Sequence, residues 1–139
     1  MVQYLRFFAI AIQAWFFTPT AGIAQPTVLL ESLPQFSIEE LHERLIIADR
    51  KSSKEFEDQV EKRGGAIVIG AIAEVDPGRN GTFFVWLRTS DRKIVGRFML
   101  PAGYTSGVEM LRTGQEVRLA CEFPYRSYSG HVSSSCRIQ

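Results

Sequence analysis

The sequence predicts a mainly β domain preceded by a helical segment, and three observations support this prediction. Apolar residues recur at helical spacing between residues 37 and 63. From residue 65 onward the apolar period changes to two, as expected of strands with one buried face. Turn sequences such as Pro77-Gly78 and Asn80-Gly81 interrupt the alternating stretches at short intervals.

The first 24 residues have the layout of a secretory signal peptide. Arg6 precedes an apolar run over residues 7–17, and Pro19 follows before small residues that end at Ala24. The run is shorter than the roughly 20 apolar residues that span a bilayer. We therefore expect cleavage after Ala24 and an exported protein, periplasmic or secreted; an uncleaved membrane anchor is the alternative. Residues 25–36 contain two prolines and are expected to form a flexible lead-in.

A helical segment is predicted over residues 37–63. Ser37 and Glu40 have the spacing of a capping box, and Ser52 and Glu55 repeat it. The pattern fits one kinked helix or two helices, ended by a pair of glycines at residues 64 and 65. The apolar stripe of this segment comprises Ile38, Leu41, Leu45 and Ala48, widened by Ile46 and Ile47.

Five strands are expected within residues 64–139, at residues 66–75, 82–89, 93–100, 116–123 and 131–138. A short helix at residues 106–112 is expected between the third and fourth strands. This order of elements is that of a small five-stranded OB-fold barrel. The fold prediction is therefore an OB-fold-like barrel behind an N-terminal helical segment.

Cys121 and Cys136 are the only two cysteines and lie symmetrically about the turn sequence of residues 127–130. In an antiparallel hairpin, residues whose numbers have a constant sum face each other, so the two side chains meet on one apolar face. An oxidising compartment favours a disulfide between them. The bond would close a loop of about fifteen residues, worth ~3 kcal/mol in a chain-entropy model. Two free, buried thiols are the alternative.

Several short stretches resemble the tRNA-anti-like family of bacterial OB-fold proteins. The resemblance covers residues 37–139, and the matching residues are Gly70, Leu111, Gly114, Gln115, Val117, Cys136 and Ile138. It implies an OB-fold behind a helical lead-in. Members are largely uncharacterised exported or membrane-attached proteins, so the resemblance implies no reaction.

The sequence offers little for catalysis. His42 lies in the predicted helix and His131 at a turn edge, where a solvated side chain is the default for both. The chain contains no Gly-x-Ser-x-Gly, His-Glu-x-x-His or phosphate-cradling loop. We expect no enzymatic activity, no cofactor and no metal site.

The outer surface of the second and third strands is the candidate ligand face, as in other OB-folds. If the barrel interior takes the fully apolar side of each strand, the outward side chains are Phe84, Trp86, Arg88, Val95, Arg97 and Met99. Phe84, Trp86, Arg88 and Arg97 are the predicted ligand-binding residues, because exposed aromatics and arginines suit stacking and bidentate contacts. The stripe of the N-terminal helix is the expected cover for this surface, and an open binding face is the alternative. If the helix covers it, function moves to the loops at residues 76–81 and 101–107.

The functional prediction is an exported OB-fold binding module that recognises a protein or an envelope component. One alternative is a structural or assembly protein that docks through its acidic N-terminal helix. A binder of single-stranded nucleic acid is the last alternative, because the net charge is only +1 and phosphate-tracking proteins usually carry a clear basic excess.

Overall fold

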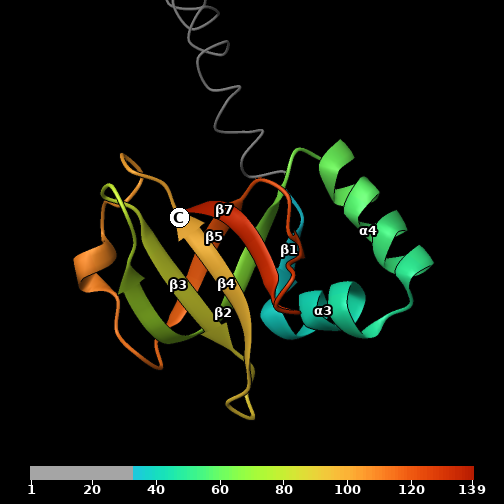
Figure 1. Cartoon of the computed structure of the whole chain (residues 1–139), viewed down its shortest axis with the longest axis horizontal. Helices are drawn as coiled ribbons and strands as arrows, with labels where there is room; N and C mark the ends of the chain where they lie inside the picture. The colour runs from blue at the N-terminus through green and yellow to red at the C-terminus, as the bar shows by residue number, and fades with distance from the viewer. Residues whose placement is uncertain (1–32) are drawn as a thin grey trace, which may run out of the picture. The chain divides into compact units, whose positions relative to one another are not determined.

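Five strands close into a barrel in the computed structural model, which describes residues 33–139 (Figure 1). The ring runs β2–β3–β4–β7–β5 and returns to β2. Neighbours in the ring are antiparallel except β4 and β7, which pair in parallel. The strands are β2 (Ala66–Pro77), β3 (Phe83–Arg88), β4 (Ile94–Leu100), β5 (Glu116–Cys121) and β7 (Val132–Ile138). The predicted OB-fold-like barrel is confirmed.

Two short strands extend the sheet beyond the predicted five. β1 (Gln35–Ser37) pairs in parallel with the start of β2, so the end of the expected lead-in is ordered. β6 (Tyr125–Arg126) pairs with β7. The helix expected before β5 is a single 3-10 turn, η2 (Val108–Met110). The predicted signal peptide and residues 25–32 of the lead-in lie outside the described residues.

The helical segment consists of two helices that meet at a break. The first continues from α3 (Ile38–His42) into the π-helical turn η1 (Glu43–Ile47), and the second is α4 (Arg50–Lys62). Ser37 caps the first as predicted, because its Oγ accepts a hydrogen bond from the backbone N–H of Glu40 at 3.1 Å. The repeated capping box predicted that the second helix begins at Ser52. It begins at Arg50 instead. Asp49 caps it, since its Oδ1 accepts from the N–H of Ser52 at 2.9 Å.

The apolar stripe of the first helix closes one end of the barrel. Ile38, Leu41 and Leu45 are buried in the same core as the inward side chains of the strands. A Cβ added at Gly70 would lie 2.9 Å from Ile38 Cγ2, and one at Gly96 would lie 2.8 Å from Ile38 Cδ1. β2 and β4 thus carry glycine where the Ile38 side chain enters the barrel, because a side chain at either position would occupy the space that Ile38 fills. The expectation that this stripe covers the outer face of the second and third barrel strands is wrong.

The second helix packs beside the first and beside β1. The ring of Phe56 meets that of Phe36 edge to face, with centroids 5.1 Å apart, and the Arg44 guanidinium lies 4.9 Å from the Phe56 centroid. The buried Ser53 Oγ donates to the carbonyl of Leu45 at 3.1 Å. Figure 1 shows α4 on the opposite side of β1 from β3 and β4. Over residues 33–139, no helix has both the length and the apolar character needed to cross a membrane.

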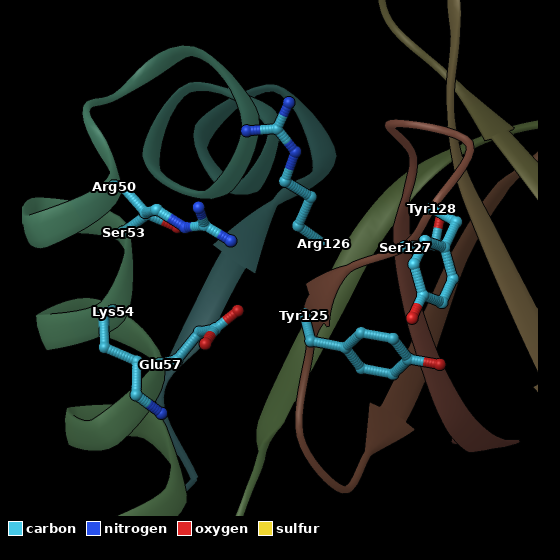
Figure 2. A pocket seen from close by; sticks show the side chains of 8 residues that line it. All are labelled: Arg50, Ser53, Lys54, Glu57, Tyr125, Arg126, Ser127 and Tyr128. Carbon is cyan, nitrogen blue, oxygen red and sulfur yellow. The ribbon is translucent and has the colours of Figure 1, made fainter.

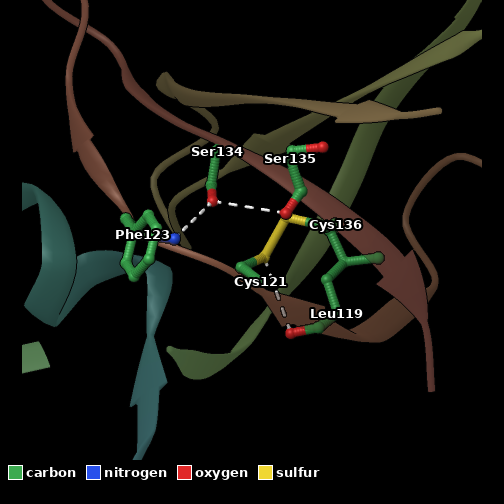
Figure 3. The surroundings of a disulfide bond; sticks show 6 residues. All are labelled: Leu119, Cys121, Phe123, Ser134, Ser135 and Cys136. Carbon is green, nitrogen blue, oxygen red and sulfur yellow. Dashed lines mark hydrogen bonds between the residues drawn. A yellow bond between two sulfur atoms is a disulfide. The ribbon is translucent and has the colours of Figure 1, made fainter. Parts of the chain in front are cut away.

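The predicted disulfide joins β5 to β7 (Figure 3). Cys121 and Cys136 are paired across the two strands, with Cα atoms 4.1 Å apart, and both are buried. Beyond Cys121 the register changes by one residue, and Tyr125 pairs with Ser133. The N–H of Phe123 donates to Ser134 Oγ at 3.2 Å in the gap between the two ladders. The disulfide therefore fixes β5 to β7 where the regular pairing ends.

We predict that Ile38→Ala destabilises the protein by ~2–5 kcal/mol, because it empties a fully buried site at the barrel end. Denaturant unfolding measures the loss. Ile47→Ala is the matched control, since Ile47 lies in the same helical run and is 58% exposed. It should change stability by less than about 0.5 kcal/mol. Equal small losses for the two variants would contradict the role assigned to Ile38.

Candidate ligand-binding face

Three of the four predicted ligand-binding residues come together on the outside of the barrel. Phe84 and Trp86 lie one pleat apart on β3, and Arg97 on β4 is the cross-strand partner of Trp86. The Arg97 guanidinium carbon is 3.8 Å from the Phe84 ring centroid and 5.4 Å from that of Trp86. Phe84 and Trp86 are half-buried and Arg97 is exposed. We call these three residues the aromatic–arginine cluster.

Arg88 lies away from this cluster. The pairing of β3 with β4 shifts between Leu87 and Arg88, so Arg88 is opposite Ile94. Its guanidinium lies beside Gly114, where a Cβ would be 3.4 Å from Nη2. The same shift leaves Val95 without a cross-strand partner and turns it into the core, where it is 1% exposed. The prediction that Val95 faces outward is therefore wrong.

Two polar groups hold the Trp86 ring in place. Its Nε1–H donates to Asp76 Oδ2 at 3.0 Å, and its ring meets the His131 imidazole edge to face with centroids 5.6 Å apart. His131 is held by the β6–β7 turn, where Ser129 Oγ lies 2.8 Å from its Nδ1. The N–H of His131 also donates to Ser127 Oγ at 3.2 Å. Trp86 is thus fixed before any ligand arrives, which lowers the entropy cost of binding.

An acidic pair borders the cluster on β2. Glu74 and Asp76 are the cross-strand partners of Trp86 and Phe84. A hydrogen bond with Asp76, together with the negative charge of Asp76, raises the pKa of Glu74. Glu74 is exposed, so this pair marks an acidic rim of the face and leaves its centre to the aromatic rings.

A groove begins at the cluster and crosses β4 toward β7 and β6. We call it the β4–β7 groove, and its volume is about 420 Å³. Phe123 and Tyr125 on its far wall are 48% and 49% exposed. The groove is lined by Phe84, Arg97, Met99, Glu122, Phe123, Tyr125, Ser127, Ser133, Ser134 and Ser135. It therefore combines apolar rings with hydroxyl groups and one arginine.

The far wall of this groove was not predicted from the sequence. Phe123 was expected in a regular strand, residues 127–130 in a turn, and His131 in solvent without a partner. Two tyrosines and an arginine between residues 125 and 128, in the connection between the last two predicted strands, were the available indication. Exposed aromatic side chains that gather into one patch mark an interaction site, whereas single ones do not.

The N-terminal helix borders the face without covering it. Glu39 Oε1 accepts a hydrogen bond from the N–H of Ser90 at 3.0 Å, which ties α3 to the turn between β3 and β4. His42 lies near the same turn, and its Nδ1 is buried with no hydrogen-bond partner among the described residues. Over residues 33–139, no group of three or more His, Cys, Asp or Glu side chains is arranged to hold a metal ion.

No protein-family model and no curated protein matches this chain. Among solved structures, the chain is similar to a "putative nucleic acid-binding lipoprotein" from Klebsiella pneumoniae subsp. pneumoniae MGH 78578. The two chains are 16% identical with a TM-score of 0.58, over 79% of this chain and 94% of that one. At this identity the likeness shows a shared fold alone. The OB-fold-like barrel implied by the resemblance to the tRNA-anti-like family is present in the structure, whereas membership of that family is not shown.

We predict that His42 makes the folded state less stable as pH falls. Burial is the main cause that lowers the pKa of His42, and the positive charge of Lys93 lowers it further. The negative charges of Glu43 and Asp91 raise this pKa by less than the other causes lower it. The unfolded chain then binds a proton at higher pH than the folded chain does. Stability is therefore lost as pH falls from the ordinary histidine value of about 6.5 toward the lower folded value.

Urea unfolding at about pH 7.5 and about pH 5.5 tests this dependence. Between these two values, His42→Gln should lose less unfolding free energy than the wild type. Lys51→Gln, at an exposed position of α4, is the control for substitution by glutamine and should behave as the wild type does. An unchanged pH dependence in His42→Gln would show that His42 is not the responsible group.

Proposed function

We propose that this chain is an exported, non-catalytic binding module that recognises a protein component of the cell envelope through its aromatic–arginine cluster. The observation that carries the proposal is the packing of Arg97 over Phe84 and beside Trp86, next to an open groove. A guanidinium and two rings held in this way present a rigid, partly apolar surface. Such a surface loses little conformational entropy when a partner binds.

The composition of the face matches that of protein interfaces. Trp, Tyr, Phe, Met and Arg are enriched at interface cores, while Lys and Glu are depleted. The cluster and the β4–β7 groove contain all five of the enriched types, and Glu122 is the one charged residue of the groove besides Arg97. Binding energy in protein complexes concentrates on Trp, Tyr and Arg. We therefore take Trp86 and Arg97 as the anchors.

Export is supported by the signal-like leader and by the buried disulfide, since structural disulfides persist in oxidising compartments. The absence of catalysis is supported by the state of the polar groups at the face. Asp76 accepts from Trp86, and the His131 ring is engaged by Ser129 and Trp86. These contacts serve to position Trp86.

Single-stranded nucleic acid is the second candidate ligand, and two observations favour it. The similar Klebsiella structure is described as that of a "putative nucleic acid-binding lipoprotein", and half-buried rings beside an arginine can stack on bases. The net charge of +1 weighs against it, because phosphate contacts dominate such affinity. A protein partner remains the better-supported proposal.

We predict that Trp86→Ala and Arg97→Ala each weaken the partner complex by ~2 kcal/mol or more, as interface anchors do. Partners would be captured from envelope extract with the wild-type protein and identified, and their affinities measured with each variant. The matched control is Arg88→Ala, because Arg88 is on the same strand as Trp86 but lies beside Gly114. It should bind as the wild type does.

Three further results would decide against the proposal. Wild-type affinity in both Trp86→Ala and Arg97→Ala would show that the cluster is not the binding face. A loss of ~3–5 kcal/mol of stability in Trp86→Ala, as for a core aromatic, would mean that the ring serves the fold instead. Tight binding of an unstructured oligothymidine that both variants abolish, without any captured protein, would favour the nucleic-acid candidate.

A further inference from the structure

A second groove lies between α4 and the β6–β7 turn (Figure 2). We call it the α4–β6 groove, and its volume is about 750 Å³. In Figure 2, the side chains of Arg50 and Glu57 extend from α4 toward the hairpin that carries Tyr125 and Arg126. The lining residues that matter here are Arg50, Lys54, Glu57, Tyr125, Arg126 and Tyr128. The proposed function does not account for this groove.

The charge of this groove is positive and largely unpaired. Arg50 and Arg126 form no ion pair with any of the described residues. Lys54 is paired with Asp58 at 3.3 Å along α4, which leaves two guanidinium groups as the free cations of the groove. Glu57 is the only carboxylate among its lining residues. Guanidinium groups bind carboxylates through paired, charge-assisted hydrogen bonds.

The aromatic rings of this groove are available to a ligand. Tyr128 is fully exposed at the tip of the turn, with a relative exposure of 112%, and Tyr125 is 49% exposed. β6 pairs with β7 only, so its other edge has no strand partner within the described part of the chain, while η1 lies beside β6. An unpaired strand edge can accept the backbone of an extended peptide.

The two grooves adjoin each other. Tyr125 and Ser127 line both of them, so a path runs from the aromatic–arginine cluster across β4 and β7 to α4. A ligand that crosses this path must be extended. Its part in the β4–β7 groove meets rings and hydroxyl groups, whereas its part in the α4–β6 groove meets two arginines.

We propose that the α4–β6 groove binds an acidic, extended segment of the partner protein. The proposal rests on the proposed function for the partner's class and adds the chemistry of the segment. Arg50 and Arg126 bind acidic side chains of the segment, and Tyr125 and Tyr128 pack against its apolar ones. Glu57 in the wall and the near-neutral chain favour a peptide with spaced carboxylates over a polymer with one phosphate per unit.

A defined peptide tests this proposal without knowledge of the natural partner. The probe is a labelled dodecapeptide that alternates glutamate with tyrosine and valine. A peptide with lysine in place of glutamate and an oligothymidine of equal length are the comparison ligands. Binding to the full-length protein is followed by fluorescence anisotropy, and the site by amide chemical shifts in ¹⁵N-labelled protein.

We expect saturable binding of the acidic peptide, with shifts concentrated at Arg50, Tyr125, Arg126 and Tyr128. The double variant Arg50→Glu/Arg126→Glu should weaken it at least tenfold. Arg118→Glu is the matched control, because Arg118 is an exposed arginine on β5 that lines neither groove. It should bind the peptide as the wild type does.

The proposal is overturned if the acidic peptide does not bind at millimolar concentration. It also fails if Arg118→Glu weakens binding as much as the double variant does. Preference for the oligothymidine, lost in the double variant, would replace the acidic segment by a phosphate polymer. These results do not test the role of Trp86. Partner capture by Trp86→Ala tests the proposed function separately.

Discussion

Ile38 of the N-terminal helix inserts into the end of the barrel, and this insertion determines where the helix packs. Its side chain is fully buried between Gly70 and Gly96, on two strands that would otherwise leave this end of the core open to water. Burial of Ile38, Leu41 and Leu45 removes the apolar stripe of the helix from solvent. The helix therefore does not pack against the outer surface of β3 and β4, and that surface stays accessible.

The accessible surface is shaped by two local irregularities. The register shift after Leu87 turns Val95 inward and moves Arg88 away, which leaves Arg97 as the arginine that packs on Phe84 and Trp86. The register change after Cys121 releases the chain from β5, so that Tyr125 lies opposite Ser133 on β7. The disulfide anchors the chain immediately before this change. Tyr125 lines both candidate grooves, so both grooves depend on this register change.

Features that depend on local spacing could be predicted from the sequence. The five barrel strands, the Ser37 cap and the pairing of Cys121 with Cys136 all follow from period, capping chemistry or a constant sum of residue numbers. Features that depend on tertiary contacts could not. The site of the helix stripe was missed because it depends on space left by Gly70 and Gly96 on separate strands. The fourth strand was predicted two residues too long because the N–H of Phe123 donates to the Ser134 hydroxyl and not to a backbone carbonyl, and the alternation of apolar residues does not reveal this contact.

The N-terminal helix closes the barrel end and leaves the β3–β4 face accessible. Hydroxyl-radical footprinting of the full-length protein, read by mass spectrometry, distinguishes an accessible face from a covered one. We predict rapid modification of Tyr125 and Tyr128, intermediate modification of Trp86, and protection of Phe98, which is fully buried inside the barrel. Protection of Trp86 equal to that of Phe98 in the free protein would show that the β3–β4 face is covered.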